Sequence, residues 1–119
     1  MDLHEFCVFC EIAAGRAPAT VVKEWPRALA IVPLEPVTDG HVLVLPKDHS
    51  ADFTTGSATL LWATMGAAQL AREMGGDMNL ITSKGRAATQ SVFHLHLHLV
   101  PRRKGDSLTL PWTTAEAVA

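Results

Sequence analysis

Histidine and leucine alternate through residues 94–99, with Val100 next, and the stretch 94–100 limits the fold more than any other part of the chain. Successive side chains of a β-strand point to opposite faces, so a strand here would place the histidines on one face and the leucines on the other. A helix would rotate each residue by about 100° and give the histidines no common face. We therefore expect a strand over residues 94–100, ended by Pro101.

The histidines of this strand, His94, His96 and His98, are suited to chemistry. Imidazole has an unperturbed pKa of about 6.5 and serves as base, nucleophile, acid or metal ligand at neutral pH. Serine, threonine or lysine would solvate a strand face equally well, and clustered imidazoles repel one another when protonated. A functional site is therefore favoured. One reading is a catalytic metal ion held by all the histidines, although alternate residues on a flat strand stand roughly 7 Å apart.

Composition narrows the class of protein. The 119 residues, 48% of them hydrophobic, suit a single domain over 1–119. A net charge of −2 offers no basic field for nucleic acid, and no apolar run is long enough to span a membrane. The N-terminus lacks the pattern of a secretory signal. Two cysteines three residues apart favour a metal site in a reducing compartment over a disulfide, so we expect a cytoplasmic protein.

The pattern of apolar residues, prolines and glycines predicts the remaining elements. Strands are expected over 20–25, 28–32, 41–45 and 77–83, a long helix over 56–75, and a short helical turn over 10–14. Short connections in the order β-β-β-α-β-β indicate an α+β domain with an antiparallel sheet of about five strands. The domain core is expected over about 6–104, followed by a C-terminal tail over 105–119.

Several motifs together resemble one family. The stretch 94–100 matches, at every position, the His-φ-His-φ-His-φ-φ signature (φ, apolar) of the histidine triad (HIT) nucleotide hydrolases and transferases. Residues 85–92 resemble the family's approach to this signature, with Thr89 in place of a glycine. Residues 40–49 resemble its Gly-His-x-Leu-Val-φ-Pro-Lys-x-His segment, and residues 7–10 its Cys-x-Phe-Cys opening. The resemblance implies a HIT-like fold and a homodimer with the long helix at the interface.

The resemblance also implies a chemistry. His96 matches the nucleophile that forms a nucleotidyl-histidine intermediate, and His98 matches the histidine that contacts phosphate and assists the leaving group. His94 matches the member that supports the site and binds zinc in metal-containing relatives. The implied substrates are nucleoside phosphoramidates or dinucleoside polyphosphates, such as AMP or GMP conjugates. The alternative is a nucleotide-binding or protein-interaction module with little turnover.

Substrate-binding residues follow from the same resemblance. The residues implied at the phosphate or leaving group are Gln90 and Ser91, and those implied at the base are Val8, Phe9, Ile12, Ile31 and Leu43. Ser83 is a further substrate-binding candidate, since it stands where the family commonly has an asparagine before the phosphate loop. Gln90 and Ser91 could instead only cap a loop, Ile31 and Leu43 could be plain core, and His41 could be structural or support the site. Pro33 stands where the family has the acidic residue that holds the ribose, so Glu35, Asp39 or the backbone must replace it. The base preference, the leaving group and the physiological substrate are left open.

A zinc site is the second implication. Cys7 and Cys10 supply half of a tetrahedral site, which His49 and His94 could complete. In the family these four positions hold a structural zinc, so zinc is the cofactor that the resemblance implies. Such a closed site would tie the N-terminal turn to the triad strand and leave no open position for substrate. Two free buried cysteines are the alternative.

Overall fold

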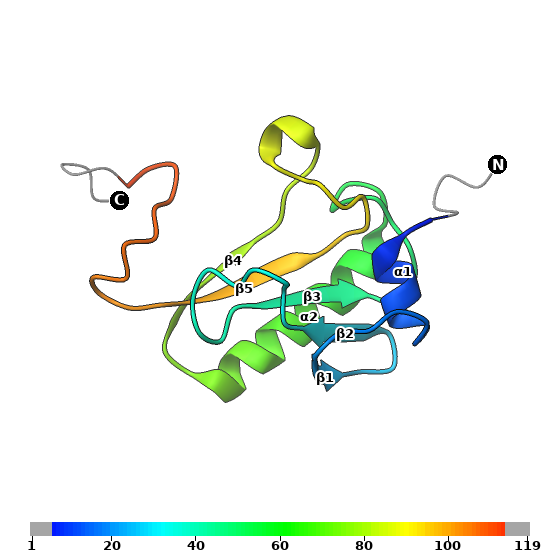
Figure 1. The fold of residues 1–119 in the computed structure, drawn as a ribbon, viewed down its shortest axis with the longest axis horizontal. Coiled ribbons are helices and arrows are strands. Elements are labelled where there is room, and N and C mark those ends of the chain that lie inside the picture. Colours follow the sequence, from blue (N-terminus) through cyan, green and yellow to red (C-terminus); the bar gives the residue numbers. More distant parts are fainter. Residues whose placement is uncertain (1–5, 114–119) are drawn as a thin grey trace.

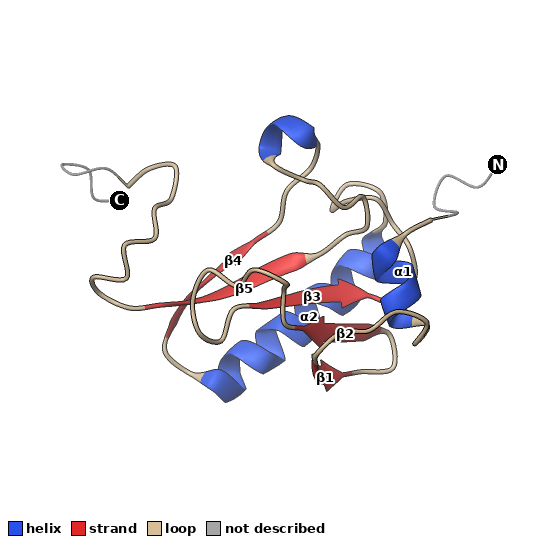
Figure 2. Ribbon diagram, viewed as in Figure 1, coloured by secondary structure: helices blue, strands red, loops and turns tan. Residues whose placement is uncertain are grey.

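The computed structural model describes residues 6–113; residues 1–5 and 114–119, the two ends of the expected domain, lie outside the described part. A five-stranded antiparallel sheet has the order β1-β2-β3-β5-β4, with the long helix α2 across one face and the short helix α1 at one end (Figures 1 and 2). The elements in chain order are α1 (Val8–Ala13), β1 (Val21–Glu24), β2 (Ala28–Ile31), β3 (Val42–Pro46), α2 (Ser57–Met74), β4 (Asp77–Ile81), the 3-10 helix η1 (Arg86–Ala88) and β5 (Leu97–Arg102). The structure confirms the expected α+β class, the expected sheet of about five strands and both expected helices.

Helix α2 packs closely on the sheet because small side chains face the strands. Ala63, Gly66 and Ala67 are all buried at this contact. A Cβ atom at Gly66 would stand 3.1 Å from the Trp25 ring, so glycine leaves room for the indole to lie against the helix. The leucines of the triad stretch join this layer: Leu95, Leu97 and Leu99 are buried with Ala30, Val42, Val44 and Leu70.

The opposite face of the sheet carries a second apolar cluster and the histidines. Phe9 of α1 packs there with Leu29, Ile31, Leu43 and Leu45. Leu43 of β3 pairs with His98 of β5, so the two residues lie side by side on this face. The alternation in the sequence therefore predicted the two faces correctly: leucines toward α2, histidines toward the α1 side.

The expected limits of the triad strand are wrong at both ends. β5 begins at Leu97, and His94 to His96 precede it in a segment held by loop contacts, among them Leu95 N–H donating to the Ser50 carbonyl at 2.7 Å. β5 also continues through Pro101 to Arg102. Pairing with β3 ends at Leu99, and beyond it β5 is paired with β4 alone. A proline at 101 therefore leaves no hydrogen bond to β3 unmade.

Within residues 6–113, no helix combines the length and the apolar character needed to cross a membrane.

Candidate active site and metal centre

His96 has its two ring nitrogens in different environments. Its Nδ1 lies 2.7 Å from the main-chain carbonyl oxygen of His94. A carbonyl only accepts hydrogen bonds, so Nδ1 carries the hydrogen and Nε2 keeps its lone pair. Burial lowers the pKa of His96, an effect partly opposed by the bond to the His94 carbonyl. The ring is thus neutral at neutral pH, with Nε2 as a free nucleophilic nitrogen.

A second chain of hydrogen bonds fixes the tautomer of His98. The Val37 N–H donates to Nδ1 of the buried His41 at 3.1 Å, so His41 carries its hydrogen on Nε2. That Nε2 lies 3.0 Å from Nδ1 of His98, to which it donates. The remaining hydrogen of His98 is therefore on Nε2. Burial first, and then the neighbouring His96 and His41, lower the pKa of His98 to about 4.

These hydrogen bonds place the lone pair on Nε2 of His96 close to the N–H donor on Nε2 of His98. The rings of His96 and His98 have centroids 5.3 Å apart. His41, which the sequence left open between a structural and a supporting role, contacts His98 directly. A neutral imidazole beside a fixed N–H donor can attack an electrophilic phosphorus and stabilise the charge that develops on its oxygens or on the leaving atom.

The apolar residues expected at the base lie on the same side of the sheet. The Phe9 ring stands edge-on to His96, with centroids 5.1 Å apart. Ile31 and Leu43 are buried in the cluster around Phe9, and Ile12 packs against it half-buried. The structure therefore brings Phe9, Ile12, Ile31 and Leu43 together, and their contact with a base remains a prediction.

The loop before the triad holds the expected phosphate residues in different environments. Gln90 is buried, and its amide bonds only backbone: it accepts from Gly85 N–H at 2.8 Å and donates to the carbonyls of Ala51 at 2.7 Å and Val92 at 3.1 Å. Gln90 thus clamps the loop, and its contact with substrate remains a prediction. Ser83 is half-buried beyond the end of β4.

Ser91 and Val8 border a cavity beside this loop. The cavity has a volume of about 300 Å³ and is lined by Phe6, Cys7, Val8, His49, Ser91, Val92 and Phe93. The Arg86 guanidinium lies over the Phe93 ring, 5.1 Å from the ring centroid and within the limit of about 6 Å for a cation–π contact. Sequence reasoning did not find this pair, because nothing in the stretch 85–92 that contains Arg86 indicates a contact with Phe93.

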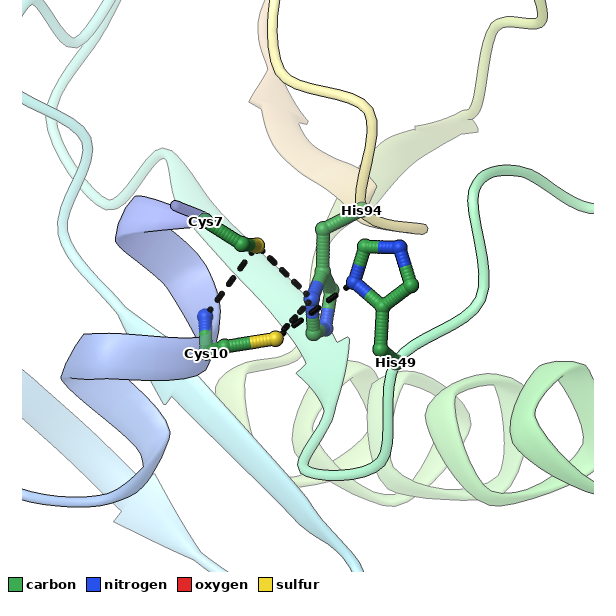
Figure 3. A group of neighbouring side chains, drawn as sticks. All are labelled: Cys7, Cys10, His49 and His94. Carbon is green, nitrogen blue, oxygen red and sulfur yellow. Dashed lines mark hydrogen bonds between the residues drawn. The ribbon is translucent and has the colours of Figure 1, made fainter. Parts of the chain in front are cut away.

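Four side chains from three separate segments converge on one point (Figure 3). The ligand atoms of Cys7, Cys10, His49 and His94 all lie within 4.8 Å of one another. His94 Nδ1 is 3.4 Å from each sulfur, and His49 Nδ1 is 3.4 Å from the Cys10 sulfur. Zinc bonds of about 2.3 Å to sulfur and 2.0–2.1 Å to nitrogen at tetrahedral angles separate S and N by roughly 3.6 Å, so these residues fit zinc.

The chemistry of the donors also fits a cation. His94 Nε2 lies 2.7 Å from the Pro46 carbonyl oxygen and donates to it, which leaves Nδ1 with a lone pair toward the cysteines. Burial first, and then Cys7, raise the pKa of the Cys10 thiol to about 12, and a bound cation would offset both effects. Since one ring nitrogen of His94 faces the cysteine sulfurs and the other is bonded to the Pro46 carbonyl, the reading of one metal ion held by all the histidines of the triad is disfavoured.

Comparison with known proteins gives consistent matches over most of the chain. The HIT domain pattern matches residues 14–105. The chain is 40% identical over 110 residues to an uncharacterized HIT-like protein of Mycobacterium tuberculosis, which covers 87% of this chain and 76% of that protein. It is 33% identical over 117 residues to the adenosine 5′-monophosphoramidase HNT1 of Saccharomyces cerevisiae, covering 96% of this chain and 74% of the yeast protein. A crystal structure of a Zn-bound histidine triad family protein from Mycobacterium smegmatis superposes with a TM-score of 0.79 at 42% identity, covering 87% of this chain and 80% of that one.

Proposed function

Because the chain belongs to the HIT domain family, we propose that it is a nucleotide hydrolase or transferase that acts through a nucleotidyl-histidine intermediate on His96. Its substrates are nucleoside phosphoramidates or dinucleoside polyphosphates with a purine base. The observation that carries this proposal is the Nδ1 bond of His96 to the His94 carbonyl, which leaves Nε2 available for attack. The adenosine 5′-monophosphoramidase activity in the name of the yeast relative supports the substrate class.

In the first step, Nε2 of His96 attacks the phosphorus that bears the nucleoside. A P–N bond forms as the bond from phosphorus to the leaving group breaks. The negative charge of the bound phosphate raises the pKa of His98, so this ring takes up a proton from solvent when the substrate binds. The protonated ring gives the hydrogen on Nε2 to the leaving atom and is left neutral, ready to accept a proton in the second step.

In the second step, water attacks the same phosphorus and the P–N bond to His96 breaks. The proton of the water passes to His98, which returns the ring to the state it had before the first step. The products are a nucleoside monophosphate and the free enzyme. The base contacts Phe9, Ile12, Ile31 and Leu43, and Val8 flanks it at the edge of the cavity. Ser91, Ser83 and Gln90 serve the phosphate, Gln90 chiefly by holding the loop through its backbone bonds.

Zinc is the proposed structural cofactor. Cys7, Cys10, His49 and His94 would hold it, and it would supply a fixed tetrahedral tie between α1, the loop after β3 and the segment before β5. The Zn-bound relative from M. smegmatis supports this assignment. Both cysteines are free thiols, in keeping with a cytoplasmic location.

A homodimer is the proposed assembly. The outer side of α2 exposes Leu61 and Met65, and the edge strand β4 exposes Leu80 and Ile81. Apolar side chains on an open sheet edge are unusual for a monomer, because such an edge can pair with another chain. Light scattering after size-exclusion chromatography should give twice the chain mass of 12.8 kDa, and a monomer would contradict the proposal.

Kinetics on a substrate panel test the proposed function. Adenosine and guanosine phosphoramidates and diadenosine polyphosphates are offered to the wild type, to His96→Ala and to His98→Ala. Turnover of at least one substrate by the wild type is expected, with His96→Ala inactive and product binding retained within about tenfold, since base and phosphate contacts remain. Near-normal turnover by His96→Ala would exclude this nucleophile. Binding of nucleotides by the wild type without turnover would instead support the alternative of a binding module.

A further inference from the structure

We propose that the zinc site positions the nucleophile, through the main-chain carbonyl of His94 and the ring of Phe9. This inference rests on the proposed role of His96 and extends it: the metal site would control the orientation of His96 as well as stabilise the fold. His94 and Phe9 are then positioning residues, and neither needs to react with the substrate. Two independent sets of contacts lead from the ligands to the His96 ring.

The first route runs through His94 itself. Its ring is fully buried, with Nε2 held by the Pro46 carbonyl at 2.7 Å and Nδ1 facing both cysteine sulfurs. Its carbonyl oxygen accepts the Nδ1 hydrogen of His96 at 2.7 Å. The ladder of β5 begins only at Leu97, so no strand pairing fixes this carbonyl. The peptide group that carries this carbonyl is held on one side by Leu95 N–H, which donates to the Ser50 carbonyl at 2.7 Å, and on the other by the anchored ring of His94.

The second route runs through α1. This helix has six residues, fewer than an isolated helix needs for stability in water, so its position depends on tertiary contacts. Phe9 lies between Cys7 and Cys10, and its ring stands edge-on to His94 and to His96, with centroids 5.9 Å and 5.1 Å away. Tying both cysteines to His94 would press this ring against His96.

Loss of the metal should change the orientation of the His96 ring. Loss of the metal would free the His94 ring on its Nδ1 side and α1 at its first turn, while the apolar cluster around Phe9 would still hold the fold. His96 could then turn, or exchange its ring hydrogen between Nδ1 and Nε2. Misplacement of a reacting group by about 1 Å can cost about a hundredfold in rate. We expect kcat to fall at least tenfold, and KM to rise as well, because α1 also carries Val8, Phe9 and Ile12 of the proposed base site.

The test compares zinc-loaded and chelator-treated full-length protein. Nitrogen-15 NMR of the His96 ring distinguishes a nitrogen that bears hydrogen from one that does not, and circular dichroism reports whether the protein stays folded. His94→Cys keeps a donor for zinc but loses the bond to the Pro46 carbonyl, so its kcat should lie between those of the wild type and His94→Ala. His49→Ala removes the ligand that comes from the loop after β3 and should reproduce the effect of chelation. Phe9→Leu keeps all four ligands and tests the second route alone.

The expected result is a single Nδ1–H tautomer of His96 in the zinc-loaded protein and a mixture after metal removal, with kcat reduced. An unchanged tautomer and kcat in metal-free folded protein would overturn the proposal. Where chelation unfolds the protein, zinc-loaded Phe9→Leu decides: shifted His96 signals with lower kcat support the proposal, and unchanged signals and kcat overturn it. If the zinc-loaded wild type turns over no substrate, the proposed function fails, while the NMR comparison still decides the positioning role.

Discussion

Replacing His41 with alanine should lower kcat about five- to tenfold, because His41 fixes the tautomer of His98. In the wild type, the Val37 N–H donates to Nδ1 of His41, and Nε2 of His41 donates to Nδ1 of His98 at 3.0 Å. The variant removes this donor, so the hydrogen of His98 can move to Nδ1. In that tautomer, Nε2 no longer offers a hydrogen to the leaving group.

The size of the effect follows from the lost hydrogen bond. A buried hydrogen bond contributes about 1 kcal/mol net, and 1.36 kcal/mol corresponds to a factor of ten in rate. The upper limit is the whole contribution of an acid–base group, about 10²- to 10⁴-fold, which His98→Ala should approach. His41→Ala should therefore lie clearly between the wild type and His98→Ala.

Single-turnover rates at a temperature where all the variants are folded make this measurement. The control is His41→Gln, whose side-chain amide can still direct an N–H toward His98 and should recover most of the rate. Wild-type kcat in folded His41→Ala would refute the reasoning, and so would a glutamine variant no faster than alanine.

Three further predictions follow from the site and its loops. The pH profile of kcat/KM should stay flat through pH 6.5 and fall only at lower pH, because burial lowers the pKa of both His96 and His98, that of His98 to about 4, and the free site needs both rings neutral; an acidic limb at 6.5 would contradict this. Thr89→Gly should raise the free energy of unfolding by up to about 1 kcal/mol, because Thr89 has φ 74° and a left-handed conformation strains a β-branched residue. Ala88→Gly in η1 is the control and should not stabilise the protein; urea denaturation measures both variants. The wild type should distinguish ribonucleotide from 2′-deoxyribonucleotide substrates less than threefold. Pro33→Asp should favour the ribonucleotide about tenfold. A wild type with strong ribose preference would show that Glu35, Asp39 or the backbone already holds the sugar.

The sequence predicted the faces of the triad stretch better than its limits. Alternation alone predicted that the leucines and the histidines lie on opposite faces, because side-chain direction depends on local geometry. That the face of Leu97 and Leu99 packs on α2 is known only from the structure. The start of β5 depends on where its neighbours begin and end, which no local pattern records. Continuation through Pro101 likewise depends on β3 having already ended its pairing at Val42.

The site shows the same division between local and long-range information. The Cys-x-x-Cys motif is visible locally, but its partners His49 and His94 lie 39 and 84 residues beyond Cys10, and only the family resemblance linked them. The bond between His41 and His98 spans 57 residues and was left open. Such contacts are set by the packing of the sheet, which brings distant strands together, and are not encoded in any short window of sequence.

The most direct test of the account is to trap the intermediate on His96. Wild-type protein is mixed with a substrate labelled at the α-phosphate and quenched within milliseconds. The quench is alkaline because a phosphoramidate on histidine is acid-labile. The intact protein and its peptides are then examined by mass spectrometry. We predict a burst of one nucleotidyl group per active site, located on His96 and absent from His96→Gly. Continuous turnover with no such adduct, or an adduct on another residue, would contradict the covalent mechanism.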